Sequence, residues 1–305
     1  MARTGAFAYL KYGYENTFKG GSSLRNKYLG RAMKASSSAT HNAEPIYELG
    51  QNNPSTFLYK QFEGSLSVDW ALSNPWFFKL LLGQVNTSGT SPPYTHTFTR
   101  STTLPSAEIE IGFTGEGGDG TSLLKGAVLS SVSISSAVND IIKVRGEFLY
   151  AKRDNGTYGT PGVDSFDPYV FANMRLELPS GTVLAEVQSA ELTINNNVLG
   201  VYELGNYEVQ GALKQAFEVK GRLSITMKDR TFLDMLRDSY NNMVLKITNG
   251  LTGANEVSIT INLGKVFFES HNVSYEPNAI VIEDVSILST DITSVVAKNA
   301  VSSVP

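Results

Sequence analysis

One short phrase occurs twice in this chain, and the repeat constrains the fold more than any other feature. The copies read Tyr47-Glu48-Leu49-Gly50 and Tyr202-Glu203-Leu204-Gly205, and the second begins 155 residues after the first. A strand pattern and then a short helix pattern follow each copy. The sequence therefore predicts an internal duplication, in which the two halves of the chain have the same fold.

The strands after the two copies can be matched residue by residue. Phe62–Val68 corresponds to Val219–Ile225, which places Gly64 on Gly221, and apolar residues alternate after each glycine. Alternation with a period of two is typical of a strand with one buried face. We therefore expect the two segments to hold equivalent places in the two halves.

A short helix is predicted after each of these strands. In Ser73–Gly83, Pro75 suits the first helical turn, and Gly83 permits the left-handed conformation that ends a helix. Thr231–Leu236 holds the same place in the second half with a weaker pattern. The apolar residues of both segments are interpreted as core packing.

The rest of the chain alternates strand patterns with clusters of Gly, Pro, Asn and Ser. The glycine- and proline-rich stretch 153–162 is interpreted as the boundary between a first domain, residues 1–157, and a second domain, residues 158–305. Phe18–Pro45 is predicted to be an extended arm or long loop, and Gln84–Pro105 a second long loop. The fold class is therefore mainly β, with two similar domains that each carry one short helix.

Composition narrows the function classes. Charged residues make up 18% of the 305 residues, the net charge is −4 and the pI is about 5.5, which argues against a protein that grips nucleic acid through its phosphates. The chain has no cysteine, so thiol chemistry is excluded. No apolar run approaches the roughly 18 residues of a membrane span, so no membrane anchor is expected.

Residues that could carry chemistry were considered and set aside. Gly115–Gly120 fits the spacing of a dinucleotide-binding loop but joins two predicted strands instead of opening a helix. His41, His96 and His271 lie far apart and have no partner at the spacing of a metal site or catalytic triad, so surface or turn positions are expected for them. The sequence predicts no catalytic residue, cofactor or metal, and hence no enzyme.

The chain resembles the tail tube proteins of long-tailed phages and related prokaryotic viruses. The resemblance rests on the loop Tyr47–Gly50 and on Phe62–Trp70 running into Asn74-Pro75-Trp76 and the leucines before Gly83. It implies a β-sandwich or rolled sheet with a flanking helix, whose copies close into rings that stack into a hollow tail tube for the genome. Most members carry one such domain and form rings of six, and members with two form rings of three that imitate sixfold symmetry.

The resemblance also implies the partners of the chain. These are further copies of itself, other tail proteins such as the tape measure and tail terminator, and viral DNA that passes without specific binding. The protein would be part of the virion tail and be assembled in the host cytoplasm. A lumen that releases DNA should be neutral or acidic, and Glu108 and Glu110 are the candidate lumen acids.

The alternative from another class is a carbohydrate-binding or adhesive β-sandwich module of a virion or cell surface. In that case an exposed Trp76 or a cluster of tyrosines would form the sugar platform.

Overall fold

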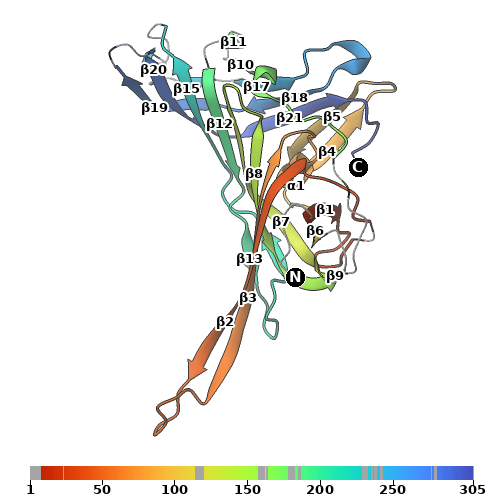
Figure 1. The fold of residues 1–305 in the computed structure, drawn as a ribbon, viewed down its shortest axis with the longest axis vertical. Coiled ribbons are helices and arrows are strands. Elements are labelled where there is room, and N and C mark those ends of the chain that lie inside the picture. The colour runs from red at the N-terminus through yellow and green to blue at the C-terminus, as the bar shows by residue number, and fades with distance from the viewer. Residues whose placement is uncertain are drawn as a thin grey trace.

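The computed structural model describes residues 8–22, 24–113, 120–156, 162, 164–177, 183–184, 187–228, 233–234, 236, 239–240, 243–275, 277 and 280–304. A long twisted sheet packs against a shorter one, and a narrow hairpin projects from one end of the long sheet (Figure 1). The predicted mainly β class is confirmed.

Among the described residues the long sheet has twelve strands. Nine follow one another in the order β16-β19-β20-β15-β12-β7-β8-β3-β2, while β6 and β9 also pair with β7 and β1 pairs with β6. Their bounds are β1 (Ala8–Tyr14), β2 (Arg31–Ile46), β3 (Thr56–Ala71), β6 (Ala107–Phe113), β7 (Thr121–Ala137), β8 (Lys143–Tyr150), β9 (Lys152–Gly156), β12 (Val187–Asn195), β15 (Glu218–Thr226), β16 (Ser239–Tyr240), β19 (Val266–Ser274) and β20 (Ile282–Ser289).

The shorter sheet has seven strands within the described ranges, in the order β11-β10-β17-β18-β21-β5-β4. Its strands are β4 (Gly83–Ser88), β5 (Tyr94–Arg100), β10 (Met174–Glu177), β11 (Val183–Leu184), β17 (Val244–Thr248), β18 (Ser258–Leu263) and β21 (Ile292–Asn299). Two further strands, β13 (Leu199–Val201) and β14 (Gly211–Leu213), form a separate hairpin, and η2 (Phe171–Asn173) and η3 (Gly253–Asn255) are single 3-10 turns.

The two halves of the chain contribute strands to the long sheet in the same order. In the first half the spatial order is β2-β3-β8-β7, and in the second it is β12-β15-β20-β19. When the four strands of each half are numbered as they occur along the chain, their order across the sheet is first, second, fourth, third in both halves. This agreement is compatible with the predicted duplication.

The two repeats are joined by hydrogen-bonded strands. The last strand of the first set, β7, pairs antiparallel with the first strand of the second set, β12, from Ser131 opposite Asn195 to Ala137 opposite Ser189. In the shorter sheet, β5 of the first half pairs with β21 of the second. Both sheets and one hydrophobic core therefore run through the two halves. The division into a first domain, residues 1–157, and a second domain, residues 158–305, stays a prediction, and the two parts are called repeats below.

The hydrophobic core lies between the two sheets, and it contains the apolar residues that alternate with polar ones along the strands. Leu66, Val68 and Trp70 of β3 are buried, and so are Ile261 of β18 and Val295 of β21 in the other sheet. Burying this apolar surface is the main force that holds a sandwich together. The opposite face of the long sheet is left polar.

The predicted first helix is confirmed as α1 (Phe77–Leu82). The side chain of Asn74 accepts a hydrogen bond from the backbone N–H of Trp76, 3.1 Å away, and Gly83 ends the helix with φ of 102°. All residues of α1 except Lys79 are buried. Half of the second predicted helix, Thr231–Leu236, lies outside the described residues, and Leu233 and Asp234 within it are helical.

The extended arm predicted for Phe18–Pro45 fits the projecting hairpin (Figure 1), whereas the prediction of a long loop was wrong for Gln84–Pro105. Most of Phe18–Pro45 is β2, and Gln84–Pro105 contains β4 and β5. Every residue of β2 before Ile46 is exposed, and a strand without a buried face shows no apolar alternation. Its sequence therefore gave no strand signal.

Glycine is required at the matched positions Gly64 and Gly221 because a neighbouring side chain crosses each of them. A Cβ at Gly64 would lie 2.5 Å from Cε2 of Tyr150, and a Cβ at Gly221 would lie 2.5 Å from Cγ1 of Ile287. Tyr150 reaches over Gly64 to donate a hydrogen bond to the carbonyl oxygen of Ser38, 2.7 Å away.

We expect Gly64→Ala to lower the free energy of unfolding by about 1–3 kcal/mol, the usual cost of forcing extra volume into a packed site. Denaturant unfolding followed by circular dichroism measures the change. Ser65→Ala, one residue further along and exposed on the polar face of the long sheet, is the control and should change stability by less than about 0.5 kcal/mol. Equal stability of the two variants would contradict the steric account.

Candidate assembly surface

The open face of the long sheet is a continuous polar surface that crosses both repeats. Asp69, Arg145 and Ser133 lie opposite one another on β3, β8 and β7, and the row continues through Thr193 of β12 to Lys220 of β15. Residues opposite each other on neighbouring strands share one face of a sheet. Acidic, basic and hydroxyl side chains therefore alternate across this surface, which we call the open face.

Many of these charges are balanced by neighbours. Arg145 donates from Nε to the carboxylate of Glu147 at 2.8 Å and lies 3.9 Å from that of Asp69. The hydroxyl of Ser133 donates to Glu191 at 2.8 Å, across the junction of the two repeats. Such paired charges leave little excess of either sign to hold a passing polyanion.

The sequence contains a pattern that indicates the open face. Ser65, Ser67 and Asp69 alternate with apolar residues on β3, and Ser131, Ser133 and Ser135 do the same on β7. Alternation shows which residues are solvated, but only the sheet order shows that they form one surface.

The two outer strands of the long sheet have unpaired edges. Within the described residues, β2 pairs with β3 on one side and with no strand on the other, and it is exposed along nearly its whole length of 16 residues. At the other end β16 pairs only with Val266 and Phe267 of β19, so the stretch 268–274 of β19 has β20 as its partner on one side and no strand of the described chain on the other. A long exposed edge is a template for pairing with another chain.

The repeated loops lie at the tips of two hairpins. Tyr47–Gly50 is in the loop between β2 and β3, and Tyr202–Gly205 is in the loop between β13 and β14. Gly50 and Gly205 have φ of 87° and 83°, respectively, a region that favours glycine. The predicted equivalence of the two phrases therefore extends to their place in the fold.

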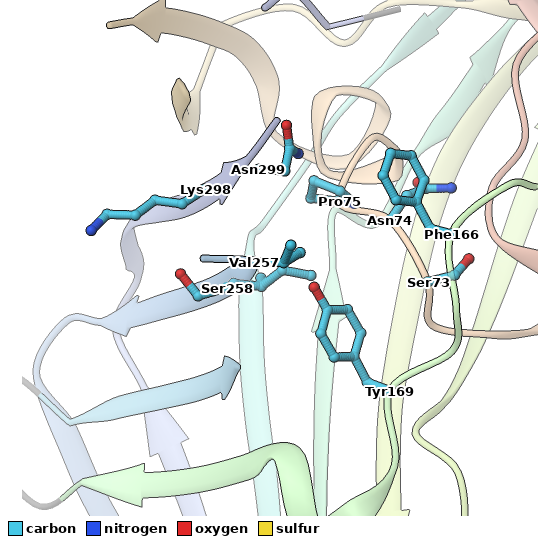
Figure 2. Close-up of a pocket in the computed structure, with 10 residues that line it drawn as sticks. Ser73, Asn74, Pro75, Phe166, Tyr169, Val257, Ser258, Lys298 and Asn299 are labelled. Carbon is cyan, nitrogen blue, oxygen red and sulfur yellow. The ribbon is translucent and has the colours of Figure 1, made fainter. Parts of the chain in front are cut away.

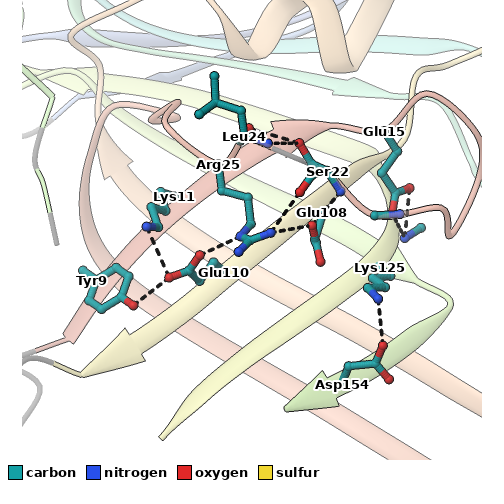
Figure 3. Close-up of polar contacts among 12 residues, drawn as sticks. Tyr9, Lys11, Glu15, Ser22, Leu24, Arg25, Glu108, Glu110, Lys125 and Asp154 are labelled. Carbon is teal, nitrogen blue, oxygen red and sulfur yellow. Dashed lines mark hydrogen bonds and ion pairs between the residues drawn. The ribbon is translucent and has the colours of Figure 1, made fainter. Parts of the chain in front are cut away.

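Glu108 and Glu110 lie in a buried ion-pair cluster and not on the open face (Figure 3). Their exposed fractions are 2% and 0%. Arg25 joins the two carboxylates, from Nη1 to Glu108 at 3.0 Å and from Nε to Glu110 at 2.7 Å. The interpretation of these two residues as lumen acids does not fit this position, because the segment around Arg25 covers this face of β6.

Glu110 has two further partners in this cluster. Tyr9 donates a hydrogen bond to it at 2.7 Å, and Nζ of Lys11 lies 3.3 Å away. Burial alone would raise the pKa of Glu110, but the hydrogen bonds from Arg25 and Tyr9 and the charge of Lys11 hold it below its ordinary value. The cluster thus fastens the N-terminal strand and the following segment to the sheet.

The histidines also have structural partners. His96 is fully buried between Thr87 and Asn299, and His271 lies 2.8 Å from the buried carboxylate of Glu283. Burial lowers the pKa of His96. The expectation of surface or turn positions was therefore wrong for these two and holds only for His41, which is exposed on β2.

The depression drawn in Figure 2 has no room for a small ligand. Ser73, Asn74 and Tyr169 lie beside Lys298 and Asn299 there, but their side chains leave no space for a water molecule. Within the described ranges no group of three or more His, Asp or Glu side chains could hold a metal ion. Residues 114–119 of the glycine-rich loop lie outside the description.

Trp76, one of the two alternatives named for a sugar platform, is not available for this role. Trp76 is only 3% exposed, and its ring packs edge-on against that of His96 at 5.1 Å between centroids. A buried indole cannot stack on a sugar.

Among the described residues, no helix is long and apolar enough to cross a membrane.

Comparison with known protein families relates the chain to a described family. The model of a family described as phage tail tube protein matches residues 9–292 of the chain. No curated protein matches it at a significant level.

Proposed function

The chain belongs to the phage tail tube protein family, and from this premise we propose that it assembles into stacked rings that form the hollow tail tube through which the viral genome passes. Membership of the family makes it a structural component of the virion tail. The proposal adds the route of assembly. The observation that carries it is the repeated strand order of the long sheet, with a free edge at each end.

The junction inside the chain is the template for the junction between chains. Within one chain, the last strand of the first repeat, β7, pairs with the first strand of the second, β12. The equivalent strands without this pairing are β19, the last strand of the second repeat, and β2, the first strand of the first. Pairing β19 of one chain with β2 of the next continues the sheet with the same kind of contact, a head-to-tail interface that closes into a ring.

The number of chains follows from the repeat. If each repeat takes one position in a sixfold arrangement, three chains fill the ring, and this is the stoichiometry that we propose. A ring of six chains is the alternative, with twelve repeats around the axis. In both cases the exposed edge of β2 is covered, which removes an aggregation hazard.

We assign the open face of the long sheet to the lumen. Its charges are largely paired, so DNA can pass without specific binding. The other face is occupied by the core, so it cannot line a channel. Tape measure and tail terminator proteins are the further partners of such a tube, and assembly would take place in the host cytoplasm before the tail is completed.

The register of the junction between chains can be derived from the matched glycines. Thr40 follows by one position the partner of Gly64, which is Ala39, and Thr193 likewise follows the partner of Gly221, which is Leu192. By the same counting along β8 and β20, Ser274 holds the place of Ser133. Because Thr193 lies opposite Ser133 within the chain, Thr40 should lie opposite Ser274 of the neighbour.

A cross-linking experiment tests this register. The chain has no cysteine, so the double variant Thr40→Cys/Ser274→Cys introduces the only two thiols. Opposite residues of antiparallel strands have Cα atoms about 4.5–5.5 Å apart, within the range of a disulfide. On oxidation of assembled protein we expect a covalent ladder in denaturing electrophoresis that ends at three chains.

Two controls define the result. Each single variant should give no ladder, and Ser36→Cys/Ser274→Cys, displaced by four residues along β2, should give little cross-linking because about 13 Å then separates the positions. A ladder that ends at six chains would replace the ring of three by the ring of six. Monomers alone, from protein that has formed rings, would refute the β19–β2 pairing.

A further inference from the structure

The two hairpin loops that carry the repeated phrase have the same conformation. Each has nine residues, and the N–H after each loop glycine donates to a glutamate carbonyl, from Gln51 to Glu48 at 3.1 Å and from Asn206 to Glu203 at 3.2 Å. A Cβ at Gly50 or Gly205 would meet no atom within 4 Å. The glycines therefore serve the turn itself and not packing.

Both loops carry a leucine whose side chain is fully exposed to solvent. Leu49 is 105% exposed and Leu204 is 103% exposed. A fully exposed leucine gains nothing from folding, since the hydrophobic effect rewards only apolar surface removed from water. Two separate loops with the same turn and the same solvated leucine indicate a contact outside the chain.

A second leucine is repeated beside the first. Leu58 and Leu213 lie at equivalent positions, two residues beyond the first paired residue of each returning strand, and both are more than half exposed. Phe57 is exposed next to Leu58 on the first hairpin. Each hairpin thus carries more than one exposed apolar side chain, and exposed apolar surface is typical of interaction sites.

The repetition identifies the partner as further copies of this chain. A partner that meets both hairpins in the same way must itself offer two equivalent sites with the spacing of the two repeats. A stacked ring of the same protein offers this arrangement, because each of its chains has the same two repeats in the long sheet.

The opposite end of the sheet carries apolar residues at equivalent places. The hairpin tips lie at one end of the long sheet, and the turns β7–β8 and β19–β20 lie at the other (Figure 1). Val138 is exposed after β7, and Tyr275 and Ile280 are exposed after β19. The tips of one ring would therefore meet the turns of the next.

We propose that Leu49 and Leu204 are two copies of one docking residue, and that each binds an apolar turn at the opposite end of a chain in the adjacent ring. This inference rests on the proposed function and adds the residues through which rings stack. It separates two kinds of contact, with strand edges joining chains within a ring and hairpin tips joining rings along the tube.

The test is the double variant Leu49→Glu/Leu204→Glu, examined by negative-stain electron microscopy and light scattering. We expect rings to persist and tubes to disappear, or to need at least about tenfold more protein, since a central apolar anchor can dominate an interface. Each single variant should give an intermediate effect. Both leucines are solvated in the folded chain, so folding should be unchanged, which circular dichroism checks.

Leu251→Glu is the matched control, because this leucine is 55% exposed in the unrepeated loop between β17 and β18. It should form tubes like the wild type. Normal tubes from the double variant would overturn the inference while leaving the proposed function intact. Loss of both rings and tubes in the folded double variant would also overturn it, because the leucines would then act within the ring. If the wild type forms neither rings nor the Thr40–Ser274 cross-link, it is the proposed function that fails.

Discussion

If the open face lines the lumen as proposed, tubes of the variant Glu147→Lys/Glu191→Lys/Asp284→Lys should bind double-stranded DNA much more tightly than wild-type tubes. The three acids lie on the open face of both repeats, and their replacement changes the charge of this surface by six units per chain. Lysines that line a narrow passage neutralise phosphates and release counterions, which makes binding favourable at low salt.

The measurement is fluorescence anisotropy of short labelled duplexes with assembled tubes over a series of salt concentrations. We expect at least about a hundredfold tighter binding than wild type at about 50 mM salt, with a steep loss of affinity toward about 200 mM. In virions the same change should slow or stop genome ejection after triggering.

The control reverses three acids that lie outside the strands of both sheets, as Asp167→Lys/Asp234→Lys/Asp291→Lys. It changes the net charge of the chain by the same amount, so a general electrostatic effect would act on both variants equally. If the open-face variant binds DNA no more strongly than this control, the assignment of the open face to the lumen is wrong.

Replacing Glu110 by glutamine should destabilise the chain strongly and should remove part of its acid sensitivity. The variant leaves Lys11 and Arg25 beside a neutral amide, and breaking a buried ion pair costs on the order of 3 kcal/mol. The neighbouring carboxylate Glu108 still pairs with Arg25, which keeps the loss below that of an isolated buried charge.

The pH dependence follows from the lowered pKa of Glu110. In the folded chain this group gives up its proton more readily than in the unfolded chain. Its contribution is therefore present above the ordinary glutamate pKa of about 4.3 and is lost as the pH falls through the lowered folded value. The wild type should lose this stability between about pH 5 and pH 2, and Glu110→Gln should show a flatter profile there.

Denaturant unfolding at pH 7 and over the acid range measures both effects. Glu191→Gln, which changes an exposed carboxylate of the open face, should leave stability within about 0.5 kcal/mol of wild type and keep the acid profile. An unchanged acid profile in Glu110→Gln would mean that other carboxylates set the pH dependence.

Local patterns in the sequence were sufficient to predict much of this fold. The cap at Asn74, the stop at Gly83 and the apolar residues between them predict α1, and the alternation after Gly64 predicts β3. These features depend only on neighbours along the chain, namely on backbone conformation and on the period of apolar residues. The repeated phrase likewise predicts two equivalent hairpin loops.

The site could be predicted only in part. Glu108 and Glu110 alternate with Ile109 and Ile111, which shows that the acids share a face of β6 but not what covers that face. Arg25 reaches them from a segment more than 80 positions earlier. Alternation therefore cannot distinguish a buried ion pair from a solvated acid, because the covering segment is distant in sequence.

Taken alone, the sequence determined the β class, the first helix, the repeat and the absence of thiol chemistry, since each depends on residue type and local spacing. The tertiary structure decided which strands lie side by side, and with them the β7–β12 junction, the free edges of β2 and β19 and the single face that carries the paired charges. Strand neighbours are chosen by the packing of whole sheets, and β2, exposed on both faces, has no apolar period by which to be recognised.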